Sequence, residues 1–306
     1  MNNPFVTKFV AQATDILLSD VSTSRTLQLL KGSQLILKET YNYDTEGNIR
    51  VSGLADVLTQ ALYGELIVGV QNNAQASVTV KMTGEADITS TLYAQRLLNP
   101  RDPQGQKMVL AAACYGVCYP GTQKLVTVIG QVTVGLVGTN RTVAIGNVGQ
   151  VTTVDCDPAV LFPQYYGDGT ALNIGSELLL KILPAVCVDN VCVRFLNRYD
   201  VPETVVANYM TDKPQAQDDT AMMLGRRTRF DVKSTSEYTL YSGQLHHEDE
   251  VDTWQDLLTA RKAQVLLYGQ WNDVVITKSN LSRDRRNFHG SKIEISFQTA
   301  NPLLLL

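Results

Sequence analysis

Histidine is the residue type of this chain best suited to acid–base or metal chemistry, and it is scarce. The three histidines are His246, His247 and His289. His246 and His247 are adjacent, so their side chains point to different sides of the element that carries them, and His289 stands in a polar stretch. A metal site needs several ligands that converge at one place. We therefore expect solvated histidines and neither a metal nor a cofactor.

Cysteine is the second candidate for chemistry. The chain has five: Cys114, Cys118, Cys156, Cys187 and Cys192. An odd count in a long chain without a secretory signal argues against a disulfide framework. Zinc-binding pairs usually have tighter spacing than these and are flanked by turn residues. The sequence therefore predicts small buried hydrophobic residues at these positions.

Two glycine-containing loops could hold a phosphate or a cation. Residues 167–169 read Gly-Asp-Gly, and residues 44–48 read Asp-Thr-Glu-Gly-Asn. The first lacks the rest of a phosphate-binding loop, and the second lacks the later carboxylate ligand of a calcium loop. We interpret both as turns, and no set of residues predicts a catalytic centre.

Arginine gathers in two clusters that could contact a partner. One cluster is Arg226, Arg227 and Arg229, and the other is Arg283, Arg285, Arg286, His289 and Lys292. The net charge of −4 and the pI near 5.4 argue against a nucleic-acid binder. Salt bridges between subunits fit the clusters better than phosphate contacts, with a solvated loop as the alternative.

The chain ends in an apolar tail. Its last residues are Leu303, Leu304, Leu305 and Leu306. Exposed apolar patches of this kind are avoided by soluble monomers. The tail either folds back on its own core or docks on a neighbouring subunit, and we favour docking. Together with Arg283, Arg285 and Arg286, these leucines form the candidate interface.

The elements that must position these residues are mainly strands. In the first part, residues 35–41 and 49–51 alternate about the turn at residues 44–48, which predicts a hairpin. Residues 54–62 carry one apolar stripe with helical spacing, and residues 78–82 alternate again. The breaker-rich stretch at residues 99–105 marks a boundary, which gives an N-terminal β-rich domain over residues 1–105 with one short helix.

Two further β-rich domains follow. Residues 106–190 are rich in Val, Thr and Gly, with short strands at 125–129, 132–134 and 142–145 and a long loop at 155–169. Residues 176–182 fit a strand or a helical turn. Residues 191–306 alternate at 230–240, 265–268, 274–277 and 293–297 around one acidic-capped helix at 248–259. The fold class is mainly β with a few short helices, in β-sandwich or barrel-type domains.

The order of several segments resembles a family. Residues 195–203, Phe-Leu-Asn-Arg-Tyr-Asp-Val-Pro-Glu, are followed by an Arg-rich strand at 226–230, a strand–helix pair at 238–258 and a closing hairpin at 283–297. With residues 41–49, which lead into the first helix, this resembles the structural tail and baseplate (distal-tail-like) proteins that tailed phages and prophages encode. The resemblance covers about half of the chain and implies β-sandwich domains, ring-forming homo-oligomers and no enzymatic activity.

These observations favour a non-enzymatic structural component of a phage tail tip, baseplate or phage-like particle. Its partners are expected to be other copies of itself and other virion proteins, with no nucleic acid and no membrane insertion. No apolar run approaches the length of a membrane span and no signal peptide precedes the chain, so we expect assembly in the host cytoplasm. The alternative is a carbohydrate- or receptor-binding module (adhesin-like) whose loop aromatics stack on sugars. Its candidate residues are Tyr119, Phe162, Tyr165, Tyr166 and Trp271.

Overall fold

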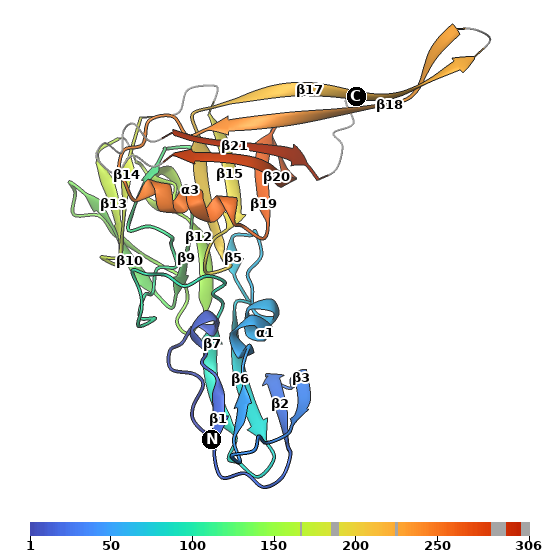
Figure 1. Cartoon of the computed structure of the whole chain (residues 1–306). Helices are drawn as coiled ribbons and strands as arrows, with labels where there is room; N and C mark the ends of the chain where they lie inside the picture. Colours follow the sequence, from blue (N-terminus) through green and yellow to red (C-terminus); the bar gives the residue numbers. More distant parts are fainter. Residues whose placement is uncertain (166, 185–189, 224–225, 283–291, 301–306) are drawn as a thin grey trace.

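The computed structural model describes residues 1–165, 167–184, 190–223, 226–282 and 292–300, with backbone alone for 215–223, 226–235, 282 and 292 (Figure 1). Its strands form five sheets, accompanied by three short helices. This confirms the mainly β fold class. In Figure 1 the N-terminal part forms a narrow lower body, and a long hairpin extends sideways from the upper one.

The N-terminal part contains a four-stranded sheet in the order β3-β2-β6-β7. Its strands are β2 (Arg25–Lys31), β3 (Gln34–Tyr41), β6 (Gln75–Met82) and β7 (Ile88–Tyr93); beside them lie the 3-10 turn η1 (Val10–Gln12), β1 (Ile16–Leu18), β4 (Ile49–Val51) and α1 (Leu54–Ala61). Leu54 and Leu58 of α1 are buried, as the helical spacing predicts. The predicted hairpin between residues 35–41 and 49–51 is wrong, because β3 pairs with β2 and β4 pairs with β1. The intervening turn is present, and the side chain of Asp44 accepts the N–H groups of Glu46 and Asn48.

The middle part consists of two small sheets. One has the order β11-β10-β13-β14-β8, and the other has the order β5-β12-β9. The elements are β5 (Gly69–Val70), β8 (Tyr115–Cys118), β9 (Leu125–Ile129), β10 (Val132–Val137), β11 (Thr142–Ile145), β12 (Val151–Asp155), α2 (Pro158–Leu161), β13 (Ala171–Ile174) and β14 (Leu178–Ile182). The loop predicted at residues 155–169 contains α2, whose first turn Asp157 caps by accepting the N–H of Ala159. β14 settles the ambiguous stretch as a strand.

The C-terminal part is a seven-stranded sheet in the order β16-β15-β19-β20-β21-β18-β17. Its elements are β15 (Val191–Leu196), β16 (Pro202–Ala207), β17 (Tyr209–Met223), β18 (Arg226–Tyr241), α3 (Glu250–Leu258), β19 (Ala263–Leu267), β20 (Gln270–Ser282) and β21 (Lys292–Thr299). Val251, Trp254 and Leu257 of α3 are buried in one hydrophobic cluster with the sheet. The predicted helix at 248–259 and the alternation at 293–297 are thereby confirmed, since Ile293, Ile295 and Phe297 are buried.

Three hydrophobic cores hold these parts. The first lies mainly in the N-terminal part, and it also contains Leu110, Ile129, Val151, Tyr199 and Val201. The second lies between the seven-stranded sheet and α3, and the third lies in the middle part. The first core thus takes side chains from all three parts of the chain. The predicted divisions at residues 105 and 190 stay predictions.

Candidate assembly interface

The turn between β15 and β16, residues 197–201, connects the three parts, and we call it the junction turn. Asn197 forms its base: its side-chain N–H₂ donates to the carbonyl of Leu110 at 2.8 Å and to the carboxylate of Glu203 at 2.7 Å. Its side-chain oxygen accepts the N–H of Tyr199 at 2.9 Å. One side chain therefore closes the turn and attaches it to the middle part.

The apolar residues of the junction turn extend into the N-terminal core. Tyr199 and Val201 are fully buried there, and the ring of Tyr199 lies 5.3 Å from that of Phe9. The Tyr199 hydroxyl accepts a hydrogen bond from Asn99 at 2.7 Å. Burial raises the pKa of this hydroxyl. The turn is therefore held by packing as well as by polar contacts.

Asp200 is the charged residue of the junction turn, and it lies between two arginines from distant segments. Its carboxylate is 3.4 Å from Nε of Arg96 and 3.3 Å from Nη2 of Arg261. Arg261 also donates to the carbonyl of Thr59 in the last turn of α1. Burial raises the pKa of Asp200 to about 6, and the two arginines oppose this shift.

Main-chain carbonyls of the junction turn also accept hydrogen bonds. The carbonyl of Asp200 accepts the N–H of Gly64 at 2.6 Å, and that of Arg198 accepts the N–H groups of Arg96 and Leu97. A Cβ at Gly64 would lie 2.9 Å from the Asp200 oxygen, so only glycine fits this approach. The guanidinium of Arg198 pairs with Asp256 of α3 at 2.8 Å. The junction turn therefore fixes the N-terminal part and α3 against the same strand pair.

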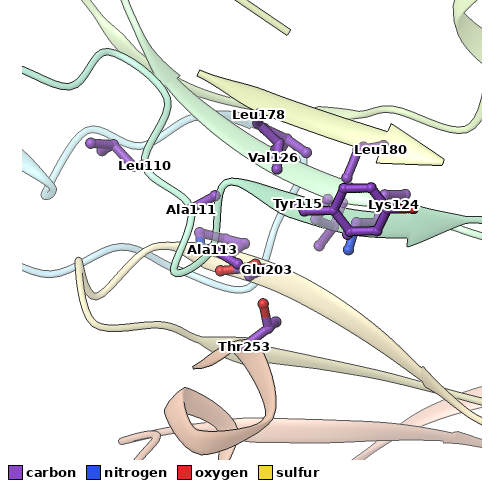
Figure 2. A pocket seen from close by; sticks show the side chains of 13 residues that line it. Leu110, Ala111, Ala113, Tyr115, Lys124, Val126, Leu178, Leu180, Glu203 and Thr253 are labelled. Atoms are coloured by element: carbon purple, nitrogen blue, oxygen red, sulfur yellow. The ribbon is translucent and has the colours of Figure 1, made fainter. Parts of the chain in front are cut away.

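The seam between the middle part and the C-terminal sheet contains buried charges. Figure 2 shows Lys124 and Tyr115 from the middle part facing Glu203 of β16 and Thr253 of α3. The cavity between them measures about 10 Å³, room for one water at most. Burial raises the pKa of Glu203, while Lys124 and Asn197 oppose the shift. This cavity therefore has no space for a substrate.

A second hollow lies outside the junction turn. It has an open volume of about 320 Å³ between residues 97–101 and α3. Its charged side chains are already paired: Arg101 contacts Asp252 at 2.7 Å, and Arg198 contacts Asp256. These groups act as structural ion pairs in the molecule.

The hairpin of β17 and β18, residues 209–241, extends from the parts that the junction turn connects. We call this hairpin the arm. Its strands have 15 and 16 residues, so it spans about 50 Å. As far as the structure describes these strands, residues 238–241 are the part of β18 that pairs with β21. Tyr238 and Leu240 anchor the arm in the C-terminal core, whereas residues 211–214 are exposed. Beyond its base the arm therefore leaves the body, as Figure 1 shows.

The two ends of the seven-stranded sheet differ. At the β16 end, three groups of the middle part cover the edge: Lys124 Nζ donates to the carbonyl of Thr204, the Leu125 N–H to its hydroxyl, and the Thr127 hydroxyl to the carbonyl of Pro202. At the other end β17 is the outermost strand. Among the described residues, the arm is therefore the end of this sheet that the rest of the molecule leaves uncovered.

The predicted interface residues fall at places that the structure describes only partly. Arg283, Arg285, Arg286 and Leu303–Leu306 lie outside the described residues, as do His289, Cys187 and Tyr166. Arg226, Arg227 and Arg229 belong to the distal half of β18, and their side chains also lie outside the described part. The predicted interface therefore stays a prediction, while the backbone places the first arginine cluster on the arm.

Four of the cysteines and two of the histidines lie in the described part of the chain. Cys118, Cys156 and Cys192 are buried, as predicted, and burial raises the pKa of each thiol. Cys114 is half-buried. The ring of His247 stacks on that of Tyr115 at 4.3 Å. Within the described residues no group of His, Cys, Asp or Glu is arranged to hold a metal ion.

Two of the loop aromatics considered for sugar stacking, Phe162 and Trp271, are covered by other parts of the chain. Phe162 is only 3% exposed and belongs to the middle core, so its predicted role in an exposed site is wrong. Trp271 lies in β20, and the guanidinium of Arg194 covers its ring at 4.2 Å. Arg194 is held in turn by Gln264 at 2.6 Å. Neither aromatic offers a free platform.

Sequence reasoning missed the junction turn and the length of the arm. The turn residues belong to the motif at residues 195–203, but their partners, such as Gly64, Arg96 and Asp256, are distant in sequence. A signal for the arm was present, because Pro214 in an alternating stretch indicates an edge strand.

None of the described helices is long and apolar enough to cross a membrane.

Comparison with known proteins yields little. No protein-family model matches the chain, and no curated protein matches it. A chain of a structure described as "Virion of native gene transfer agent (GTA) particle" aligns with 31% of this chain and 80% of its own length, with 10% identity and a TM-score of 0.24. A chain of "Tail of empty GTA particle computed with helical refinement, C6 symmetry" aligns with 36% and 91%, with 10% identity and a TM-score of 0.26. TM-scores of this size do not establish a common fold.

Proposed function

We propose that this protein is a non-enzymatic structural component of a phage tail tip, baseplate or phage-like particle. It acts by self-association and by docking neighbouring virion proteins. The sequence motif at residues 195–203 and the order of the segments that follow it support this class of protein. The proposal places the protein in the virion.

The arm is the observation that carries the proposal. A two-stranded ribbon without a third strand or a core is marginally stable in water. Here residues 211–214 are exposed, and within the described part of the chain β18 has a third strand beside it only at residues 238–241. An element about 50 Å long gains stability when a neighbouring subunit packs on it, which is the behaviour of an assembly device.

The junction turn supports the same function. A subunit that transmits force or sets the geometry of a ring needs parts that keep one orientation. The ion pairs of the buried Asp200 with Arg96 and Arg261, together with the buried Tyr199 side chain, connect the N-terminal part to the base of the C-terminal sheet. The arm is therefore presented from a frame whose parts are locked together.

The test is to shorten the arm without disturbing its base. Residues 214–236 are replaced by Asn-Gly, a two-residue turn suited to joining Lys213 and Glu237, which lie opposite each other. Tyr238 and Leu240 stay in the core. Sedimentation equilibrium over a range of concentrations measures the mass of the parent chain and of the shortened chain, and thermal unfolding serves as the fold control.

We expect the parent chain to associate with increasing concentration and the shortened chain to stay monomeric with the same unfolding transition of its body. A parent chain that remains monomeric at its highest soluble concentration, and that binds no other particle protein, would sink the proposal. Equal association of both chains would show that the arm is not the assembly device.

A further inference from the structure

The two outer edges of the arm are chemically different, and this difference deepens the proposed function. Pro214 in β17 lies opposite Ser236 in β18. Opposite residues of an antiparallel pair either exchange two main-chain hydrogen bonds or point those groups away from each other. Because proline has no N–H, Pro214 fits only the second kind of pair. The main-chain groups of Ser236 therefore point away from β17.

An independent hydrogen bond gives the same alternation. The N–H of Ser242 donates to the carbonyl of Ile293 at 3.0 Å, so the main-chain groups of Ser242 face β21. In a regular strand every second residue faces the same side, and the ladder between Lys233 and Tyr241 has no register shift. The main-chain N–H and C=O groups of Ser234 and Ser236 thus point toward the side of β18 on which β21 lies. On β17, Pro214 and Ala216 point toward the opposite, outer edge.

The row beside Ser234 and Ser236 holds no other described strand. The pairing of β18 with β21 ends at Tyr238 and Phe297. Beyond that point β21 follows β20, where Thr299 pairs with Val274 and the N–H of Ala300 donates to Asp273. β18 therefore continues past the point where β21 leaves it. Its main-chain donors and acceptors there point toward the position that a neighbouring strand would occupy.

The outer edge of β17 is the opposite case. At Pro214 it lacks a donor, and the exposed residues Asp212 and Lys213 stand just before it. Proline and charge on an outer strand are the usual protection against strand addition. One edge of the arm is thus blunted, and the other has no strand beside it among the described residues.

We propose that a strand from a second copy of this chain adds to β18 beside Ser234 and Ser236, in the row that β21 leaves, and that the outer edge of β17 accepts no strand. Charge favours a second copy as the partner: residues 226–237 include four basic and two acidic residues, whereas the whole chain carries 26 basic and 30 acidic residues. A basic edge attracts an acidic body. This inference rests on the proposed function.

Proline substitution at matched positions tests the two edges separately. Ser234→Pro and Ser236→Pro each remove a donor that the hairpin ladder does not use, on the β18 edge. Ala216→Pro removes the equivalent donor on the blunted edge, two residues from the natural Pro214, and is the matched control. Sedimentation equilibrium gives the association constant of each full-length variant, and circular dichroism with thermal unfolding gives its fold.

We expect Ser234→Pro and Ser236→Pro to weaken association at least tenfold and Ala216→Pro to associate as the parent does. Parent-like association of the two serine variants overturns the inference but leaves the proposed function standing. So does equal weakening by Ala216→Pro. A change in unfolding temperature without a change in association would show that another part of the same molecule fills the row, which also overturns it. A parent that does not associate with itself also overturns the inference, and if it binds no other particle protein either, the proposed function fails as well.

Discussion

Replacing Asp200 by asparagine removes one charge from the centre of the junction turn. The Asp200 side chain has 0% exposure, and its carboxylate contacts Arg96 and Arg261. Asparagine has nearly the same shape, and it tolerates the backbone φ of 51° found at this position. The variant therefore keeps the backbone contacts of the turn and abolishes the titration of one group.

The sign of the effect follows from the direction of the pKa shift. Burial raises the pKa of Asp200 from 3.8 to about 6, so the folded protein binds this proton more tightly than the unfolded chain does. The contribution of Asp200 to stability is fully present below pH 3.8 and is lost as the pH rises through 6. With about 1.4 kcal/mol for each pKa unit, the shift predicts a loss of about 2 kcal/mol between about pH 4.5 and about pH 7.5.

Urea unfolding followed by tryptophan fluorescence measures this loss. At each pH the free energy of unfolding of Asp200→Asn is subtracted from that of the parent, which cancels the titration of all other groups. Asp87→Asn is the control, because the pair of Asp87 with Lys81 is half exposed, and its difference should stay within about 0.5 kcal/mol. If the difference in unfolding free energy between the parent and Asp200→Asn does not vary with pH, the junction turn does not contain a buried carboxyl with a raised pKa.

Further changes probe the frame and the tail. Asn197→Ala removes the side-chain amide that donates to the buried Glu203, and it should lower the free energy of unfolding, measured in urea, by about 2–4 kcal/mol. The control is Asn272→Ala at a half-buried position, which should lower it by less than about 0.5 kcal/mol. Trp254→Ala should cost about 3–5 kcal/mol through the cavity it leaves under the sheet. Because burial raises the pKa of Cys118 and of Cys192 to about 12, a thiol reagent should label neither before unfolding; labelling of either in the native protein would contradict the burial. Deleting residues 303–306 should weaken association, as a docking tail requires, and unchanged sedimentation would remove the leucines from the candidate interface.

For some segments the sequence alone is enough to predict a strand or a helix and the face that is buried. Ile293, Ile295 and Phe297 alternate with polar residues, and Val251, Trp254 and Leu257 have helical spacing. Burial of apolar area depends on such periodicity within one element. The buried cysteines follow for the same reason, because a small thiol without a partner behaves as an apolar side chain.

Which strands lie next to each other depends on the packing of the whole chain. Residues 49–51 follow residues 35–41 across a short turn, yet they pair with β1 and not with β3. Main-chain hydrogen bonds between strands have the same chemistry whatever the side chains are, so alternation marks the faces of a strand but does not choose its partner.

For the candidate interface, too, one part is visible in the sequence and another depends on the tertiary structure. Arginine clusters and an apolar tail were visible in the sequence, and Pro214 could have been recognised as the mark of an outer strand. The protrusion of the arm and the end of the β18–β21 pairing at Tyr238 depend on where β21 turns away to follow β20. The junction turn likewise brings Gly64, Arg96 and Asp256 to one place. Contacts between residues so far apart in sequence form when the cores pack together, and no local pattern encodes them.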